Sequence, residues 1–521
     1  MSERAAHNSH ESRFTKMGAN NSRRLWLFRV LAIGVGVSML AVVEGLCVFF
    51  DWGRPGELPD PFVGFQEIRP LFVMNDTGTH YEISKSRRGF FAAESFPARK
   101  GQNTFRVFCL GGSTVQGRPY SIPTSFTTWL ELGLNAGDNR REWNVVNCGG
   151  ISYASYRLVP ILDECLQHSP DLIIVCTGHN EFLEARSYDH LKHASKWITV
   201  PVKTLSHLRT FSLMRSAWLS FQSDSPGETS QTPSQLKPEV DALLDYNRGI
   251  QAYHRDDQWR NHVVQHFEFN LRRMVRRCRD AKVPLLLLMP PSNLQNSPPF
   301  KSQHTDGMSA DQLEQWNELL QSARALYKTD LERACTLLEK AAALNHRHAG
   351  THYELAKCYE LCWRKSHNSQ CRKLAIQAYR RAREEDVCPL RMIAPLENAI
   401  RKIAVETQTP LIDIHALLEQ QTDDGILGDD FLVDHVHPSP IRGHQLIADA
   451  IATFMKQRNW FQPTSGWRRR RKTAYQAHLK SLDPLYFPRG QRTLKALQAW
   501  SQGRAEGPPI ESHETKMNGS R

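Results

Sequence analysis

The chain has 521 residues and a mass of 59.7 kDa, which is too long for one compact domain. Its content of 40% hydrophobic and 23% charged residues is ordinary for a globular protein, and it excludes a wholly disordered or fibrous chain. Residues 1–29 hold six basic and two acidic residues, and residues 459–521 hold twelve and four, so the net charge of +12 belongs to the two ends. A nucleic-acid-binding core needs a basic face on the folded domain, so a formally neutral body argues against nucleic acid as a partner.

The basic stretch 1–29 precedes an apolar segment, 30–50, in which Glu44 is the one charged residue. At about 1.5 Å per residue this segment spans on the order of 31 Å, the thickness of a bilayer core. It predicts a transmembrane signal-anchor with a cytoplasmic N-terminus, so the rest of the chain would lie on the extracytoplasmic side. A cleaved signal peptide is the alternative, but no A-x-A-like cleavage site follows the segment.

Beyond a Pro-rich stalk, apolar runs alternate with helix-like stretches such as 157–168 and 441–457. Continuous rather than alternating hydrophobicity in these runs predicts a parallel sheet that is covered on both faces. In such sheets functional groups gather beyond the carboxyl ends of the strands. The composition of residues 222–238 predicts a flexible loop, called the excursion below. The predicted strands are 104–110, 142–148, 171–178, 283–291 and 409–414.

Between the fourth and fifth predicted strands, small and aromatic residues recur at helical spacing. They resemble the packing positions of tetratricopeptide repeats, in which small residues let paired helices approach closely. At most two repeats are visible, fewer than a free-standing repeat domain needs. One interpretation is a helical insertion that packs on the main domain and could bind a protein partner. The alternative is a plain helical hairpin. The recurring positions are Ala334, Leu338, Ala341, Leu355, Ala356, Tyr359, Ala375, Tyr379 and Ala382.

The eleven cysteines are scattered, and a disulfide scaffold is not expected in so long a chain. Cys109 and Cys176 lie in apolar runs, where a thiol behaves as a small hydrophobe. Cys358, Cys362 and Cys371 could pair or bind a metal, but their spacing matches no zinc pattern and favours ordinary helical positions.

The first predicted strand ends in Gly111-Gly112-Ser113. Glycines allow a tight strand-to-helix turn that exposes a hydroxyl above the sheet edge, as a nucleophile requires. Ordinary helix capping is the alternative for the same residues.

Two further motifs bear chemically useful side chains. Asn180 follows the third strand, where its amide could donate to an oxyanion or simply bond within a turn. Asp434 and His437 are three residues apart, so on a helical turn the carboxylate could orient a general-base imidazole. The alternatives for this pair are a surface loop and a metal site that uses two histidines.

Gly-Gly-Ser-Thr after the first strand, Asn-Cys-Gly-Gly-Ile-Ser after the second, Gly-His-Asn-Glu after the third and the late Asp-x-x-His resemble, in this order, the four blocks of the SGNH (GDSL-type) hydrolases. The resemblance covers residues ~100–190 and ~280–458. It implies a flavodoxin-like three-layer α/β/α fold with a parallel sheet, which here would carry the helical insertion and the transmembrane helix.

The resemblance also implies the roles of particular residues. Ser113 would be the nucleophile and His437 the general base oriented by Asp434, with no metal or organic cofactor. The oxyanion donors would be the Ser113 N–H, Asn180, and the N–H of either Gly150 or Ser152.

Two departures from the family pattern affect loop geometry rather than proton transfer. Gly-Gly-Ser replaces Gly-Asp-Ser, and Glu181 replaces the usual Asp after Asn180. For the neighbouring residues His179 and His435, packing or contact with the edge of the substrate is favoured over catalysis.

The expected activity is hydrolysis of an ester, such as an O-acyl group on an envelope glycan or a lipid. An acyltransferase that uses a sugar hydroxyl and a non-catalytic carbohydrate-binding module are the alternatives.

The basic C-terminal tail could adhere to anionic lipid or polymer, or be a solvated end. The predicted organisation is a cytoplasmic segment (1–29), the signal-anchor (30–50), a first hydrolase part (51–310), the helical insertion (311–390), a second hydrolase part (391–458) and the tail (459–521).

Overall fold

The computed structural model describes residues 62–186, 234–245 and 249–504, together with Asp60, Thr210 and residues 31–50 except 33, 37 and 48. The chain forms two compact units. One contains residues 1–64 and 187–235, and the other contains residues 65–186 and 236–521. The second unit holds the main sheet.

Five parallel strands form the central sheet: β5 (Thr104–Gly111), β6 (Glu142–Gly149), β7 (Leu172–Cys176), β9 (Leu285–Met289) and β10 (Leu411–Asp413). Their spatial order is β10-β9-β7-β5-β6. Numbered along the chain, this is the order 2-1-3-4-5 of flavodoxin-like folds. The predicted parallel sheet is therefore confirmed, and each strand falls within or close to its predicted apolar run.

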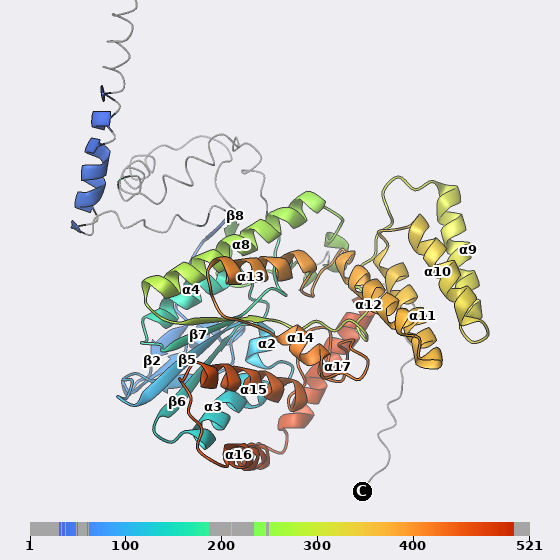
Figure 1. The fold of residues 1–521 in the computed structure, drawn as a ribbon. Coiled ribbons are helices and arrows are strands. Elements are labelled where there is room, and N and C mark those ends of the chain that lie inside the picture. Colours follow the sequence, from blue (N-terminus) through green and yellow to red (C-terminus); the bar gives the residue numbers. More distant parts are fainter. Residues whose placement is uncertain are drawn as a thin grey trace, which may run out of the picture. The chain divides into compact units, whose positions relative to one another are not determined.

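Helices cover both faces of this sheet (Figure 1). One layer contains α4 (Ser155–Leu166), α8 (Asp257–Asp280) and α13 (Ala394–Glu406), and the other contains α3 (Phe126–Gly137) and α15 (Arg442–Gln457). Every residue of β5, β7 and β9 is buried, as continuous apolar runs between two helical layers require. Smaller pieces are the antiparallel strands β2 (Phe72–Met74), β3 (His80–Ile83) and β4 (Ser95–Pro97), and the pair β1 (Val63–Phe65) and β8 (Ser234–Leu236).

Four successive helices occupy the stretch where the repeats were predicted: α9 (Ala310–Leu326), α10 (Leu331–Leu344), α11 (Ala349–Ser366) and α12 (Ser369–Glu384). They share a core of their own, in which small residues such as Ala334, Ala356 and Ala375 are fully buried. Kinship with tetratricopeptide repeats and the boundaries 311–390 remain predictions.

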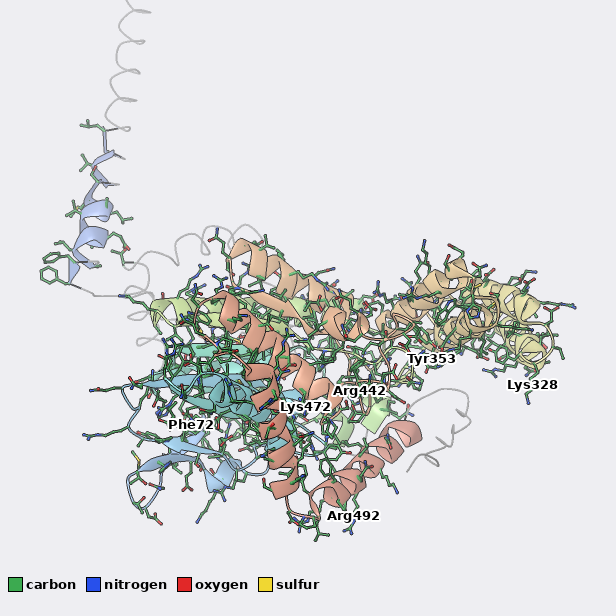
Figure 2. All side chains as sticks on the ribbon, turned by 60° about the horizontal axis from the view of Figure 1, so that its bottom comes forward. Phe72, Lys328, Tyr353, Arg442, Lys472 and Arg492 are labelled. Atoms are coloured by element: carbon green, nitrogen blue, oxygen red, sulfur yellow. The ribbon has the colours of Figure 1, made fainter. Side chains whose placement is uncertain are left out.

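The C-terminal region differs from the solvated end that its composition suggests. Between residues 467 and 504 the chain forms two helices, α16 (Trp467–Ser481) and α17 (Tyr486–Arg504). Figure 2 labels Lys472 on α16 and Arg492 on α17. The Trp467 indole donates to the Gly133 carbonyl at 2.7 Å, and the Tyr475 hydroxyl donates to the Trp129 carbonyl at 2.7 Å. Aromatic anchors thus attach a highly basic helix to α3.

The predicted excursion 222–238 and signal-anchor lie partly outside the described residues. Of the excursion, Ser234–Leu236 is the strand β8. Residues 31–47 are helical where they are described, and their apolar side chains include Leu31, 66% exposed, and Met39, 70% exposed. Within the described part of the chain, no helix has both the length and the apolar character that crossing a membrane requires.

A buried ion pair holds the start of α4, and we expect Glu184→Ala to lower the free energy of unfolding by about 3–5 kcal/mol. The Glu184 carboxylate accepts two hydrogen bonds of 2.6 Å from Arg157 and one of 2.9 Å from the Tyr156 hydroxyl, and both charged side chains are 3% exposed or less. Truncation leaves a buried guanidinium without its partner. Urea unfolding followed by circular dichroism checks this. The exposed pair of Lys402 and Glu268, broken by Lys402→Ala, should change the stability by less than about 1 kcal/mol, and equal losses would contradict the prediction.

A carboxyl group on α3 should make stability depend on pH. Burial raises the pKa of Glu131 to about 7, although its carboxylate accepts a hydrogen bond of 2.7 Å from the Val145 N–H. The folded state then binds the proton more tightly than the unfolded state, so stability falls as pH rises from about 4.5 to about 7. We expect Glu131→Gln to match the wild type at pH 4 and to be more stable at pH 8, by about 1–2 kcal/mol. Thermal unfolding at both pH values measures the difference, and a gain of equal size at both would contradict it.

Candidate active site

Ser113 lies at the carboxyl end of β5, on the turn into the short helix α2 (Ser113–Gln116). A Cβ atom on Gly111 would collide with the Cys176 carbonyl, and one on Gly112 would lie 2.6 Å from the Asn180 amide nitrogen. Position 111 therefore requires glycine because its neighbour is backbone, whereas a side chain at position 112 would have to displace the Asn180 amide. The turn brings the strand end, Ser113 and the Asn180 side chain close together.

Asp434, His437 and Ser113 form a continuous hydrogen-bonded chain. The His437 Nδ1 atom lies 2.6 Å from the Asp434 Oδ2 atom, and the His437 Nε2 atom lies 2.8 Å from the Ser113 Oγ atom. The side chains of Asp434 and His437 are 4% and 6% exposed. The structure therefore brings together three side chains that lie up to 324 residues apart in the sequence.

The acid and the base meet in a loop rather than on the helical turn that their spacing suggests. The Asp434 Oδ1 atom accepts hydrogen bonds of 2.9 Å from the N–H groups of both Val436 and His437. Burial disfavours the charged carboxylate, but the imidazoles of His437 and His435 and these hydrogen bonds outweigh burial and hold the pKa of Asp434 well below its usual value. Asp434 therefore remains an anion that fixes the orientation of the His437 ring.

Three of the four predicted oxyanion donors are available beside Ser113. The Gly150 N–H donates to the Gly111 carbonyl at 2.9 Å and is therefore engaged in the fold. Among the described residues, no acceptor faces the N–H of Ser113 or of Ser152. Ser152 has a φ of +62°, in the left-handed region that favours glycine. Of the two alternatives, the Ser152 N–H is thus the one with no acceptor among the described residues, and its role as a donor remains a prediction.

The Asn180 side chain is held in place by a hydrogen bond that uses one of its two amide protons. Its Nδ2 atom donates to the Tyr153 carbonyl at 3.0 Å, which leaves the second N–H free to point elsewhere. The next residue, Glu181, is fully buried and accepts hydrogen bonds from the Ser155 N–H at 2.7 Å and the Ser155 hydroxyl at 3.0 Å. Glu181 thus holds the beginning of α4, and this explains how an acidic residue after Asn180 supports the loop that carries Ser152.

The two nearby histidines have packing contacts. The His179 Nδ1 atom accepts a hydrogen bond of 3.1 Å from the Met392 N–H, and burial, with the neighbouring imidazoles, holds the pKa of His179 well below its usual value. The His435 ring packs edge-on against Phe300 with centroids 5.1 Å apart, and burial lowers the pKa of His435 to about 4. Both rings are therefore neutral near pH 7.

Sequence reasoning missed Asn293, which supports the loop that carries the acid and the base. The Asn293 N–H donates to the His435 carbonyl at 2.9 Å, and its side-chain amide donates to the Asp434 carbonyl at 3.1 Å and to Asp429 at 2.8 Å. Asn293 follows β9, at the carboxyl end of a predicted strand. A polar side chain at that position was the signal that could have identified it.

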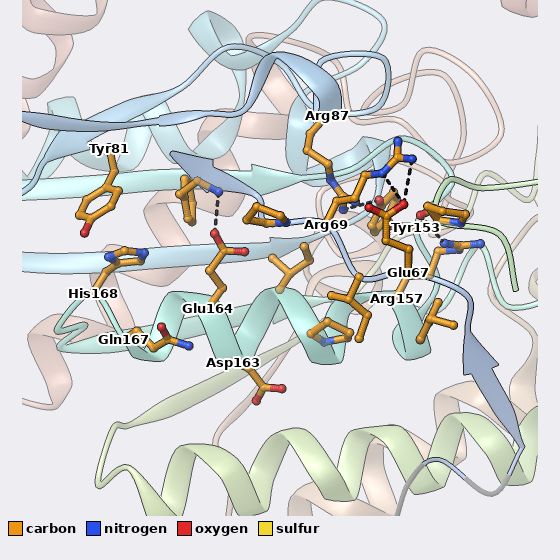
Figure 3. Close-up of a pocket in the computed structure, with 17 residues that line it drawn as sticks. Glu67, Arg69, Tyr81, Arg87, Tyr153, Arg157, Asp163, Glu164, Gln167 and His168 are labelled. Atoms are coloured by element: carbon orange, nitrogen blue, oxygen red, sulfur yellow. Dashed lines mark hydrogen bonds and ion pairs between the residues drawn. The ribbon is translucent and has the colours of Figure 1, made fainter. Parts of the chain in front are cut away.

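A cavity of about 540 Å³ lies along α4, next to the Tyr153 side chain (Figure 3). Aromatic and charged side chains of both signs line it, among them Tyr81, Arg87, Glu164 and His168. Ser113, Asp434 and His437 do not line this cavity. In the described part of the chain, no cluster of three or more His, Cys, Asp or Glu side chains could hold a metal ion.

We expect Asn180→Ala, which removes the predicted oxyanion donor, to reduce kcat for ester hydrolysis by about 10²–10³-fold with little change in KM, because such a donor acts mainly in the transition state. Steady-state kinetics with a soluble ester measure both constants. Asn180→Asp, which keeps the size but removes the donor, should show a similar loss. A variant that is impaired only in KM would place Asn180 in substrate binding instead.

No protein-family model and no curated protein sequence matches the chain. Among solved structures, the chain is similar to a protein described as a GDSL-like lipase from Parabacteroides merdae, with 10% identity, a TM-score of 0.31 and coverage of 69% of this chain and 97% of that one. It is also similar to an acetylxylan esterase from Geobacillus stearothermophilus, with 12% identity, a TM-score of 0.29 and coverage of 69% and 97%. A further acetyl xylan esterase has 12% identity, a TM-score of 0.29 and coverage of 67% and 99%.

Proposed function

We propose that the chain is a serine esterase of the SGNH type that hydrolyses an ester through Ser113, His437 and Asp434. The observation that carries this proposal is the chain of hydrogen bonds from Asp434 to His437 and from His437 to Ser113, at 2.6 and 2.8 Å. A carboxylate, an imidazole and a hydroxyl at these distances form the arrangement that activates a serine nucleophile.

In the proposed mechanism His437 takes the hydroxyl proton as Ser113 attacks the ester carbonyl carbon. The tetrahedral oxyanion accepts hydrogen bonds from the Ser113 and Ser152 N–H groups and from the Asn180 amide. His437 then protonates the departing alkoxide, and the acyl group remains on Ser113. In the second half of the reaction, His437 deprotonates a water molecule, which attacks the acyl-enzyme and releases the carboxylic acid.

The proposal includes a membrane anchor at residues 30–50 and an extracytoplasmic catalytic domain. The exposed apolar side chains of residues 31–50 and the basic residues before them support this placement. O-acyl groups on envelope glycans or lipids would then be within reach, and the helices α9 to α12 would be free to dock a protein partner.

The test is to incubate the full chain in detergent with p-nitrophenyl acetate and with a fluorophosphonate probe. We expect hydrolysis, and a covalent adduct on the tryptic peptide 107–140, which contains Ser113. Acyl transfer to added glycerol, faster than release to water, would favour the transferase alternative at the same site. Absence of an adduct on Ser113 in folded protein would refute a serine-nucleophile mechanism.

A further inference from the structure

Four cysteines lie on three successive helices of the inserted segment. Cys335 is on α10, Cys358 and Cys362 are on α11, and Cys371 is on α12. Cys335 and Cys358 are buried, and Cys362 and Cys371 are half-buried. Their chain spacing gives no indication of pairing, because the contacts depend on how the helices pack.

The thiols of Cys335 and Cys358 face each other across the interface between α10 and α11. Their sulfur atoms are 2.8 Å apart, whereas the sulfur atoms of Cys148 and Cys165, another buried pair, are 3.8 Å apart. A disulfide requires a sulfur–sulfur distance near 2.05 Å, so the first pair needs only a small movement to bond. The small residues around them, such as Ala334, already allow the two helices to approach closely.

We propose that Cys335 and Cys358 form a disulfide that joins α10 to α11. In the first step one of the two thiolates attacks a disulfide oxidant, such as oxidised glutathione, and one glutathione thiolate leaves. In the second step the other cysteine attacks the mixed disulfide and releases a second glutathione. The two protein thiols are thereby oxidised by two electrons and lose two protons, and the oxidant is reduced to two thiols.

Folding is the stage at which the bond forms most readily. Its hydrogen bond to Cys358 and its burial raise the pKa of Cys335, so little of the Cys335 thiolate is present in the folded segment. In the unfolded chain both thiols are accessible and have ordinary pKa values. An extracytoplasmic compartment, where disulfides persist, would supply the oxidant.

The crosslink would stiffen the support of the proposed active site. On α11, the Tyr353 hydroxyl donates to the Gln295 carbonyl at 2.8 Å, and Glu360 accepts from the Gln295 side chain at 2.9 Å. Two residues before Gln295 is Asn293, which supports the loop of Asp434. A bond from α10 to α11 therefore stabilises the helix that holds Gln295, two residues from the Asn293 side chain that supports the Asp434 loop.

The test is to refold the full chain with oxidised and reduced glutathione, to quench with acid and to alkylate the remaining thiols in denaturant. We expect a crosslink between the tryptic peptides 334–340 and 358–364, and alkylated Cys148 and Cys165. Peptide 358–364 contains two cysteines, so Cys362→Ser assigns the bond, and the crosslink should persist in that variant. Cys335→Ser should abolish it.

The oxidised wild type should also unfold at a higher temperature than the reduced wild type, and Cys335→Ser should lose this difference. A refolded chain with native circular dichroism in which both Cys335 and Cys358 are alkylated would overturn the proposal. So would a crosslink that joins only Cys362 to Cys371. Both results can be obtained whether or not the chain hydrolyses esters, because neither measurement depends on activity.

Discussion

Ser113→Ala is expected to lower the rate of ester hydrolysis by about 10⁴–10⁶-fold. Without the Oγ atom no acyl-enzyme can form, and the His437 ring loses the hydroxyl that lies 2.8 Å from its Nε2 atom. The oxyanion donors remain, so a small residual rate above that in water should persist. Fluorophosphonate labelling of the protein should disappear together with the activity.

The matched control is Thr114→Val, which removes the hydroxyl of the next residue in the same short helix. It should keep the activity within about threefold and label normally, and neither variant should change the free energy of unfolding by more than about 1 kcal/mol. If Ser113→Ala retained a tenth of the wild-type rate while it was fully folded, another nucleophile would have to carry out the reaction.

The sheet could be predicted from the sequence because each strand is a continuous apolar run between two helical layers. Such runs indicate burial on both faces without any knowledge of the partners. The three-residue strands β1, β2, β4 and β8 lie outside the main sheet and could not be predicted in this way, because a segment so short shows no periodicity. The strand β10 is equally short, but it lies within the predicted apolar run 409–414. The helix α16 was also missed, since its stability comes from the contacts of Trp467 and Tyr475 with α3 rather than from its own composition.

The candidate site was predictable in its residue types but not in its supporting contacts. The block motifs identify Ser113, Asn180, Asp434 and His437, because each one stands at a strand end or in a loop with a characteristic neighbour. The choice between Gly150 and Ser152 requires the backbone conformation and the hydrogen-bond partners of both residues, which composition does not encode. The geometry of the acid and the base likewise depends on a loop that Asp434 itself stabilises.

The second large effect is expected from Asp434→Asn, which should lower kcat for ester hydrolysis by about 10⁴-fold. An amide can keep one acceptor for the N–H groups of Val436 and His437, so the loop should remain folded. However, its NH₂ group would face the His437 Nδ1 atom as a donor. The ring would then carry its proton on the Nε2 atom, facing the Ser113 Oγ atom, and could not accept the hydroxyl proton.

Separate values of kcat and KM distinguish this cause from simple misfolding. A His437 ring that carries its proton on the Nε2 atom leaves the substrate site intact, so KM should change by less than about threefold while kcat falls. Asp430→Asn, an exposed neighbour on the same loop, should retain the wild-type constants and is the matched control. If Asp434→Asn kept kcat within tenfold, the carboxylate would not orient the base, and the short 2.6 Å contact would be a structural bond of the loop.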